Sequence, residues 1–254
     1  MNRRYAGRLV LALVFSAAIS GCATTQPRTG AGDPDPIEPA NRVFYSFNDT
    51  LDKYFIKPLA VGYVEIAPVP FRMAVTNFFD NLTYLNVILN SFLQGKVNDG
   101  FSDVGRFLVN STMGLGGLFD VATDMGMVRH NEDLGQTLGV WGASAGSYLY
   151  LPIRGPQTIR DLPNIASSTL LNPLTYITGA VLFPITALNV INTRANLLDE
   201  TNIRDEAAVD PYSFTREAYL QRREYLIHDG NPPTEGYDAI FDEESDEEPQ
   251  LIIK

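Results

Sequence analysis

Apolar residues recur every three or four positions through most of the chain between residues 35 and 230. This spacing places them on one face of an α-helix, and it predicts helices in residues 36–58, from Phe71 onward, and in residues 99–110. The alternation that marks a β-strand is nearly absent, and only residues 148–153 have an extended pattern. The chain is therefore predicted to be all-α, with little or no β-structure.

Local signals mark the ends of the first predicted helix. Asp35 is placed to cap it, Pro36 suits the first helical position, and Glu38 follows three residues after the cap, as in a capping box. Pro58 is expected to kink or end the helix, because proline removes a backbone hydrogen-bond donor. The apolar positions of this helix are Phe44, Phe47, Leu51 and Tyr54.

The second predicted helix is apolar on more than one face. Its main stripe consists of Val75, Phe78, Leu82, Leu85 and Leu89. Phe79 and Val87 lie off that stripe, and Gly95 is placed to end the helix. Such a helix is either part of a core or has a second face that meets lipid.

No residue between Asp161 and Arg194 is charged, and this run is long enough to span a membrane. Pro173 and Pro184 argue against a span, because they leave backbone groups that hydrocarbon does not satisfy. We predict kinked helices that lie in or against one leaflet. A buried hairpin in a soluble core is the alternative.

The last predicted helix starts at Pro211, with Asp210 as its cap, and ends near Gly230. Its predicted apolar face consists of Phe214, Ala218, Tyr219 and Tyr225. The opposite face consists of Arg216, Arg222 and Arg223.

Glycines recur in an uncharged segment, residues 134–153. They are Gly135, Gly139, Gly142 and Gly146, and a second cluster consists of Gly114, Gly116 and Gly117. In a helix the first four would share one face, where a backbone or an acyl chain approaches closely. A buried, turn-rich loop explains the same glycines equally well.

The first residues resemble the signal of a bacterial lipoprotein. Arg3, Arg4 and Arg8 precede an apolar run that ends at Gly21 and Cys22. We interpret residues 1–21 as a signal peptide and Cys22, the single cysteine, as the site of lipid attachment. Residues 22–34 then form a tether, and the absence of Asp after Cys22 places the protein at the periplasmic face of the outer membrane.

The charge of the chain limits its partners. Without residues 1–21, the chain carries 16 basic and 30 acidic residues, a net charge of −14, which argues against binding to nucleic acid. Six of the acidic residues lie in residues 242–248. Residues 231–254 are therefore predicted to be an acidic, disordered tail that follows one domain, residues 35–230.

Catalytic and metal sites have little support. Ser144 lies in a G-x-S-x-G motif, and Asp161 and His228 follow it in the order of an α/β-hydrolase triad. The strand and helix that should flank such a serine are not predicted. His130 and His228 are the only histidines and lie in no metal-binding pattern. We expect no catalytic activity, metal or cofactor apart from the covalent lipid.

Motifs through nearly the whole domain resemble the MlaA (VacJ) family. They are DPIEPANR at 35–42, NFFDNL at 77–82, LQG at 93–95, RFLVNST at 106–112, GLGG at 114–117, GQTLG at 135–139, LP at 151–152, GP at 155–156 and RD at 160–161. Leu134 and Ser147 depart from the family's pattern, and the acidic tail lies outside the match.

The resemblance implies an outer-membrane lipoprotein of intermembrane phospholipid transport. The implied fold is a ring-like assembly of kinked amphipathic helices within one membrane leaflet, with a central channel. Misplaced phospholipids would leave the outer leaflet through this channel for a soluble periplasmic carrier, and a trimeric porin would hold the ring. We expect the seven glycines to form part of the channel wall. The alternative is a structural lipoprotein that binds porin and transports no lipid.

Overall fold

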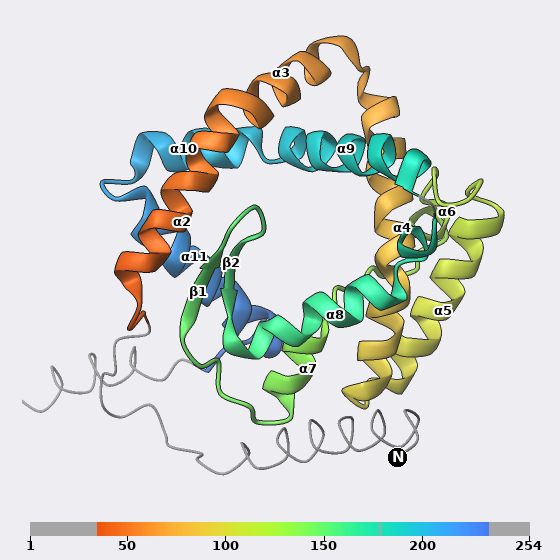
Figure 1. Ribbon diagram of the computed structural model, residues 1–254. Helices are drawn as coiled ribbons and strands as arrows, with labels where there is room; N and C mark the ends of the chain where they lie inside the picture. The colour runs from red at the N-terminus through yellow and green to blue at the C-terminus, as the bar shows by residue number, and fades with distance from the viewer. Residues whose placement is uncertain (1–34, 178, 234–254) are drawn as a thin grey trace, which may run out of the picture.

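The computed structural model describes residues 35–177 and 179–233 (Figure 1). The predicted signal peptide, lipid site and tether lie outside the described residues, as does the acidic tail from residue 234. The α-helices of these described residues are α2 (Glu38–Leu51), α3 (Lys57–Ile66), α4 (Val69–Leu93), α5 (Val97–Thr112), α6 (Val121–Asp124), α7 (Leu134–Val140), α8 (Leu162–Leu171), α9 (Gly179–Asn196), α10 (Leu198–Ala207) and α11 (Pro211–Ile227). The all-α prediction is confirmed.

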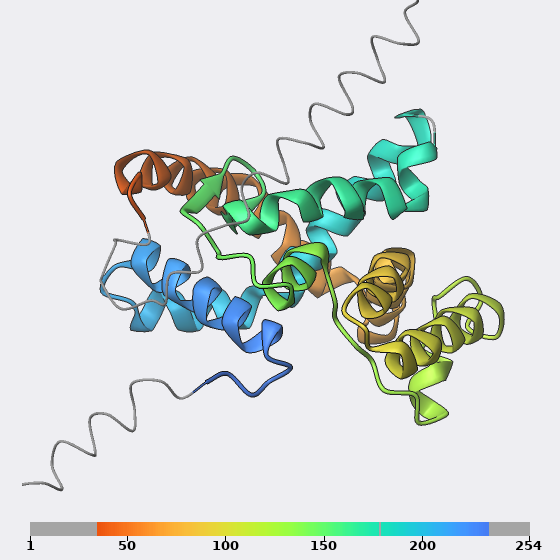
Figure 2. The ribbon, with the colours of Figure 1, turned by 90° about the horizontal axis from the view of Figure 1, so that it is seen from below.

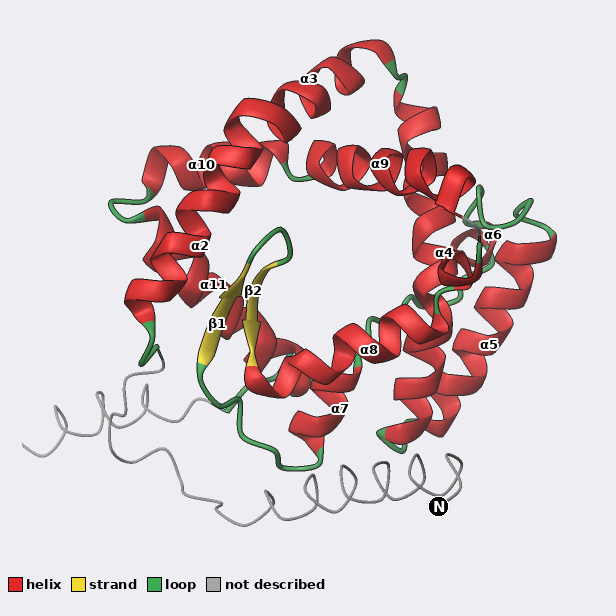
Figure 3. Cartoon of the chain, viewed as in Figure 1, coloured by secondary structure: helices red, strands yellow, loops and turns green. Residues whose placement is uncertain are grey.

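Two short strands form the one sheet that the described residues contain (Figure 3). β1 (Tyr148–Leu151) and β2 (Gly155–Thr158) pair antiparallel, with Tyr148 opposite Thr158. The extended pattern of residues 148–153 predicted β1. It did not predict β2, which begins with a glycine and a proline and lacks the usual strand composition.

The helices follow one another around a central region, and the turn of the hairpin points into it (Figure 1). α3 packs along α9, and β1 packs on α2. Seen from below, the pair α4 and α5 lies on one side of the molecule, and α2, α10 and α11 lie on the other (Figure 2). The placement of these helices in a membrane leaflet stays a prediction.

Asp35 does not cap the first helix. α2 begins at Glu38 after Ile37, and no side chain caps it. The Asp35 carboxylate is buried and accepts hydrogen bonds from Asn41 (2.7 Å) and Tyr212. Asp35 therefore connects the start of α2 to the start of α11.

Pro58 does not end the helical course, but the α-helical pattern changes just before it. A π-helical turn, η1 (Asp52–Ile56), connects α2 directly to α3, and Pro58 lies in the first turn of α3. Pro58 therefore removes a backbone donor within a continuous helical segment, and the π-helical turn just before it is a local departure from α-helical hydrogen bonding.

α4 confirms the second predicted helix and resolves its second apolar face. Phe79 and Val87 are buried, so these off-stripe residues belong to the core. Phe71 and Met73, near its start, are exposed. Gly95 follows the helix with a positive φ of 78°, as expected for a terminating glycine.

The uncharged run before Arg194 forms separate helices, as predicted. α8 is followed by a 3-10 turn, η3 (Pro173–Tyr176), and by α9, which contains Pro184. Within the described residues, none of the helices has both the length and the apolar character that crossing a membrane requires.

α11 has the predicted cap, because the Asp210 side chain accepts a hydrogen bond from the Tyr212 amide (3.1 Å). Its predicted faces hold for Tyr219, which packs against the core, and for Arg222, which is exposed, but they are wrong for three other residues. Arg223 is buried, whereas Phe214 and Tyr225 are exposed. Ion pairs with other elements decide which side of α11 turns inward, and helical spacing does not reveal them.

Candidate functional site

A cavity of about 430 Å³ lies between α2, η1, the hairpin turn, α9 and α10. Its lining combines apolar, aromatic, amide and charged side chains. The apolar and aromatic ones are Tyr45, Ile56, Tyr150, Ile153, Val190 and Leu197, and the polar ones include Asn48, Asp49, Asp52, Arg154, Asn189, Arg194 and Arg204. Such a lining suits a ligand that is itself amphipathic.

The three arginines of the cavity have different partners. Arg194 pairs with Asp52 through two hydrogen bonds, from Nε (2.7 Å) and Nη2 (2.9 Å). Arg204 donates Nε and Nη2 to a single oxygen of Asp205 (3.0 and 2.6 Å). Arg154 is exposed, and its guanidinium has no hydrogen-bond or ion-pair partner within the described part of the chain.

Two tyrosines form the aromatic side of the cavity. The rings of Tyr45 and Tyr150 meet edge to face, with 5.3 Å between their centroids. Burial raises the pKa of Tyr150 to about 12 and also raises the pKa of Tyr45. Both phenols are therefore neutral at physiological pH, so they add no negative charge to the lining.

Asn48 fixes the hairpin turn beside the cavity. Its Oδ1 accepts a hydrogen bond from the Ile153 amide (2.7 Å), and its Nδ2 donates to the Leu151 carbonyl (3.0 Å). Ile153 has a positive φ of 67°, a conformation that is unfavourable for a β-branched residue. These contacts hold the strained turn, and with it Arg154, at the cavity.

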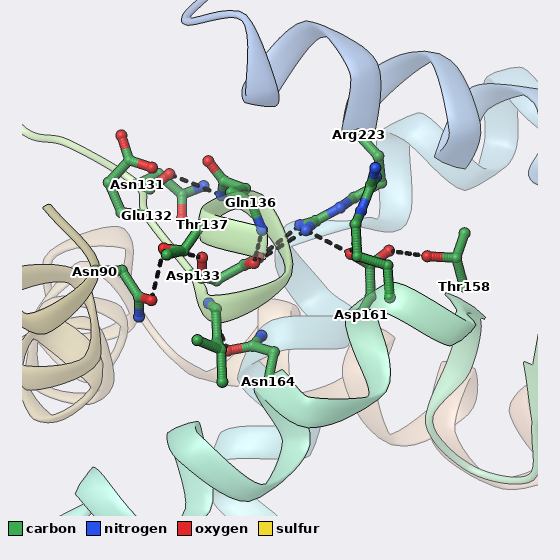
Figure 4. A network of polar contacts seen from close by, with 12 residues as sticks. Asn90, Asn131, Glu132, Asp133, Gln136, Thr137, Thr158, Asp161, Asn164 and Arg223 are labelled. Atoms are coloured by element: carbon green, nitrogen blue, oxygen red, sulfur yellow. Dashed lines mark hydrogen bonds and ion pairs between the residues drawn. The ribbon is translucent and has the colours of Figure 1, made fainter. Parts of the chain in front are cut away.

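A buried ionic network joins α7, η2 (Ile159–Asp161) and α11 (Figure 4). Arg223 donates to both oxygens of Asp133 (2.5 and 2.9 Å) and to Asp161 Oδ1 (2.7 Å). The other oxygen of Asp161 accepts hydrogen bonds from Thr158 (2.7 Å) and Tyr219 (2.6 Å). The network fixes the base of the hairpin. Both of its carboxylates, Asp133 and Asp161, are engaged by hydrogen bonds and ion pairs, so neither is free to act as a catalytic acid or base.

Comparison with known proteins identifies the family of this chain. The family described as "MlaA lipoprotein" matches residues 33–226. The chain belongs to the MlaA lipoprotein family. It is 34% identical to the intermembrane phospholipid transport system lipoprotein MlaA of Shigella flexneri and to that of Escherichia coli K12, over 88% of this chain and 90% of each relative.

Further relatives of this MlaA-family chain are known. It is 36% identical to an uncharacterised Rickettsia bellii protein, over 76% of either chain. A solved structure described as "Structural basis for maintenance of bacterial outer membrane lipid asymmetry" is 35% identical, with a TM-score of 0.67, and the match covers 76% of this chain and 98% of that one.

The four glycines of residues 134–153 do not share one helical face. α7 ends at Val140, and Gly142 and Gly146 follow in a loop with positive φ angles of 90° and 67°. None of the seven glycines lines the cavity described above. Residues 134–140 are therefore helical, as one interpretation predicted. The loop that contains Gly142 and Gly146 agrees with the other interpretation, a turn-rich segment.

Several of these glycines are packed against protein. A Cβ on Gly135 would lie 2.2 Å from Asp161 Oδ1, and one on Gly117 would lie 2.5 Å from the Asn81 side chain. A Cβ on Gly114 would lie 2.2 Å from the Phe119 carbonyl oxygen. These three glycines are buried and packed against other parts of the protein, and a place in a channel wall stays a prediction for them.

The remaining four glycines divide into two kinds. A Cβ on Gly139 would lie 2.9 Å from Ile227, and one on Gly146 would lie 3.1 Å from Ile159, so both sit against a neighbouring side chain. Gly116 and Gly142 have open space where a Cβ would be. A place in a channel wall stays a prediction for these four.

Asp161 and His228 of the hydrolase-like pattern are engaged by other partners. Both oxygens of Asp161 are occupied in the network, and His228 Nδ1 faces the Glu224 carbonyl oxygen (3.0 Å). Ser144 lies exposed in the loop after α7. Among the described residues, no group of His, Cys, Asp and Glu has the arrangement of a metal site.

Proposed function

We propose that this protein takes part in intermembrane phospholipid transport and removes misplaced phospholipids from the outer leaflet of the outer membrane. The observation that carries the proposal is membership of the MlaA lipoprotein family over residues 33–226. The relatives from Shigella flexneri and Escherichia coli are named for this transport system. The solved structure it resembles is described in terms of outer-membrane lipid asymmetry.

The cavity supports a lipid ligand on physical grounds. A phospholipid has a charged phosphodiester and acyl chains, and exposing the chains to water costs about 0.8 kcal/mol per CH₂ group. Arg154 and Arg204 offer donors to the charged end, while Ile56, Val190 and Leu197 offer apolar surface. The lining thus presents both kinds of surface that one lipid needs.

The proposed location is the inner leaflet of the outer membrane. Cys22 would carry the lipid that anchors the chain, and residues 22–34 would tether the domain to it. Large apolar side chains are exposed on several elements, among them Phe55 on η1, Leu59 and Ile66 on α3, and Phe183 on α9. Exposed apolar side chains of this number favour contact with hydrocarbon or with another protein.

The proposed partners are a trimeric porin, which would hold the protein in the membrane, and a soluble periplasmic carrier, which would accept the lipid. The protein would move lipid without making or breaking a covalent bond. The second candidate function is a porin-binding structural lipoprotein. Porin binding alone requires no amphipathic cavity, so the cavity favours transport.

The test is complementation of a strain that lacks this gene. A membrane-impermeant amine reagent would label phosphatidylethanolamine in the outer leaflet of intact cells. Transport predicts increased labelling in the deletion strain and normal labelling when the gene is restored. Unchanged labelling in the deletion strain would overturn the proposal. Copurification with porin together with unchanged labelling would establish the structural alternative instead.

A further inference from the structure

The cavity is a local exception to the charge of the chain. The full sequence has a formal net charge of −11. The cavity lining nevertheless contains three arginines and only two carboxylates, Asp49 and Asp52. Arg194 is paired with Asp52, and Arg204 is paired with Asp205, which lies outside the lining. Arg154 is therefore the arginine of the lining whose positive charge has no acidic partner among the described residues.

The hydrogen bonds of the arginines show which donors are free for a ligand. Arg194 is held by both oxygens of Asp52 and fixes α9 against η1, and its side chain is 10% exposed. Its buried Nη1 nevertheless has no hydrogen-bond partner within the described residues. Arg204 uses only Nε and Nη2, which leaves its Nη1 without an acceptor within the described residues. All the guanidinium donors of Arg154 are free there.

The position of Arg154 is built into the hairpin. Asn48 binds the backbone at the end of β1 and at Ile153 within the turn, and it keeps Ile153 in its unfavourable conformation. Strain of this kind persists where the surrounding structure enforces it, and it occurs often at ligand sites. The fixed turn places Arg154, the next residue, in the cavity lining beside the apolar side chain of Ile153.

We propose that this cavity binds the phosphate of a phospholipid headgroup through Arg154 and Arg204, with the glyceride and the first acyl carbons against Ile56, Val190 and Leu197. This inference rests on the proposed function and names the recognition step within it. Guanidinium groups donate parallel, charge-assisted hydrogen bonds to phosphate oxygens. The phosphate would supply the acceptor that the free donors of both arginines lack.

Binding to the purified full-length lipoprotein in a non-ionic detergent tests the proposal. The probes for calorimetry are dioctanoylphosphatidylglycerol, dioctanoylglycerol, which has the same chains without phosphate, and inorganic phosphate. We expect the phospholipid to bind, and we expect the double variant Arg154→Ala/Arg204→Ala to raise its Kd at least tenfold. Dioctanoylglycerol should bind more weakly than the phospholipid and equally to both proteins.

Arg222→Ala is the matched control, because Arg222 is exposed on α11 and lies outside the cavity. It removes one positive charge, as each of the two cavity substitutions does. It should bind the phospholipid like the wild type. Circular dichroism should give the double variant a Tm close to that of the wild type. If its Tm falls, the single variants Arg154→Ala and Arg204→Ala replace it, each with an expected rise in Kd of at least threefold.

Three results would overturn the inference. They are an unchanged Kd in the arginine variants, equal affinity for dioctanoylglycerol and the phospholipid, and binding of inorganic phosphate as tight as that of the phospholipid, which would make this a site for the free anion. None of them bears on the labelling of deletion cells. Normal lipid asymmetry in deletion cells, with the arginine effect intact, would overturn the transport function and leave the binding site standing.

Discussion

At the scale of single residues, the interior depends on polar side chains whose partners are remote in the sequence. Asn41 is buried, donates to Asp35 (2.7 Å) and to the Tyr148 carbonyl (3.1 Å), and accepts from the Tyr150 amide (2.8 Å). Asparagine at such a position is acceptable only because each polar group is paired. The local sequence around Asp35 is that of a helix cap. Its contact with Tyr212 could not be predicted from local spacing, because Tyr212 is remote in the sequence.

Gly135 is required by close packing in the network. An added methyl group would overlap Asp161 Oδ1, so we expect Gly135→Ala to lower the free energy of unfolding by about 1–3 kcal/mol. Gly62 in α3 has no atom within 4 Å of its Cβ position, and Gly62→Ala should raise stability by about 1 kcal/mol. Urea unfolding of both variants measures the difference. Equal effects would contradict the packing role.

The ionic network makes stability depend on pH. Burial acts to raise the pKa of Asp133, but the hydrogen bonds and charge of Arg223, with the Gln136 amide, outweigh it and lower this pKa below 3.8. The stabilisation from a depressed carboxyl pKa is complete well above pH 3.8 and is lost as the pH falls through the folded-state value. Stability should therefore decrease as the solution is acidified below about pH 4.

Asp133→Asn keeps a cap acceptor for α7 but removes one charge from Arg223. We expect a loss of about 3 kcal/mol at pH 7, because a buried ion pair is broken, and a flatter pH profile in acid. Asp199→Asn, at an exposed site with no described partner, should change stability by less than about 0.5 kcal/mol. Urea unfolding between pH 2.5 and 7 measures both. A variant profile parallel to that of the wild type would assign the acid sensitivity to other carboxyls.

At the scale of elements, periodicity predicted the helices whose apolar faces meet the protein interior. α4 and α5 follow their predicted ranges closely, and α11 begins at the predicted proline. α10 was missed because its sequence, LDETNIRDEA, has almost no apolar period. The cavity was missed for a different reason: its lining comes from five elements that only the tertiary fold brings together, and the glycine pattern drew attention to α7 instead.

The hairpin turn should depend on Asn48. Asn48→Ala removes two hydrogen bonds and should cost about 1–2 kcal/mol, since each contributes about 1 kcal/mol net. The local effect is faster hydrogen exchange at the Ile153 amide, whose acceptor is lost. Asn131→Ala, at an exposed asparagine with no described side-chain partner, is the control. Unchanged exchange at Ile153 would show that the strand pairing alone holds the turn.

At the scale of the whole molecule, helices arranged around a central region bury fewer large apolar residues than they expose. α3 shows this most clearly, with Ile66 85% exposed and Ala60 as its one buried residue. In a water-soluble domain so much exposed apolar surface is a liability. In one leaflet of a bilayer the same surface is favourable, and the ion pairs and buried amides then supply the specific contacts between helices.

Two substitutions of the same chemistry separate the core from the surface proposed to meet lipid. Phe79 is 7% exposed and Leu59 is 58% exposed. Phe79→Asp places a carboxylate in the core and should prevent folding even in detergent. Leu59→Asp should change stability in detergent by less than about 1 kcal/mol. It should nevertheless weaken membrane binding, because a charge in hydrocarbon costs about 2.5–3.5 kcal/mol at the bilayer centre and less near its surface.

Membrane binding is best measured in a Cys22→Ser background, so that a lipid anchor does not conceal the contribution of the domain. Flotation with phospholipid vesicles should retain the Cys22→Ser protein and lose the Cys22→Ser/Leu59→Asp protein. Asn202→Asp adds the same charge at an exposed polar position of α10 and should float like its parent. If Leu59→Asp floats equally well, α3 does not contact hydrocarbon, and its apolar surface must then be covered by protein, as the porin-binding alternative requires.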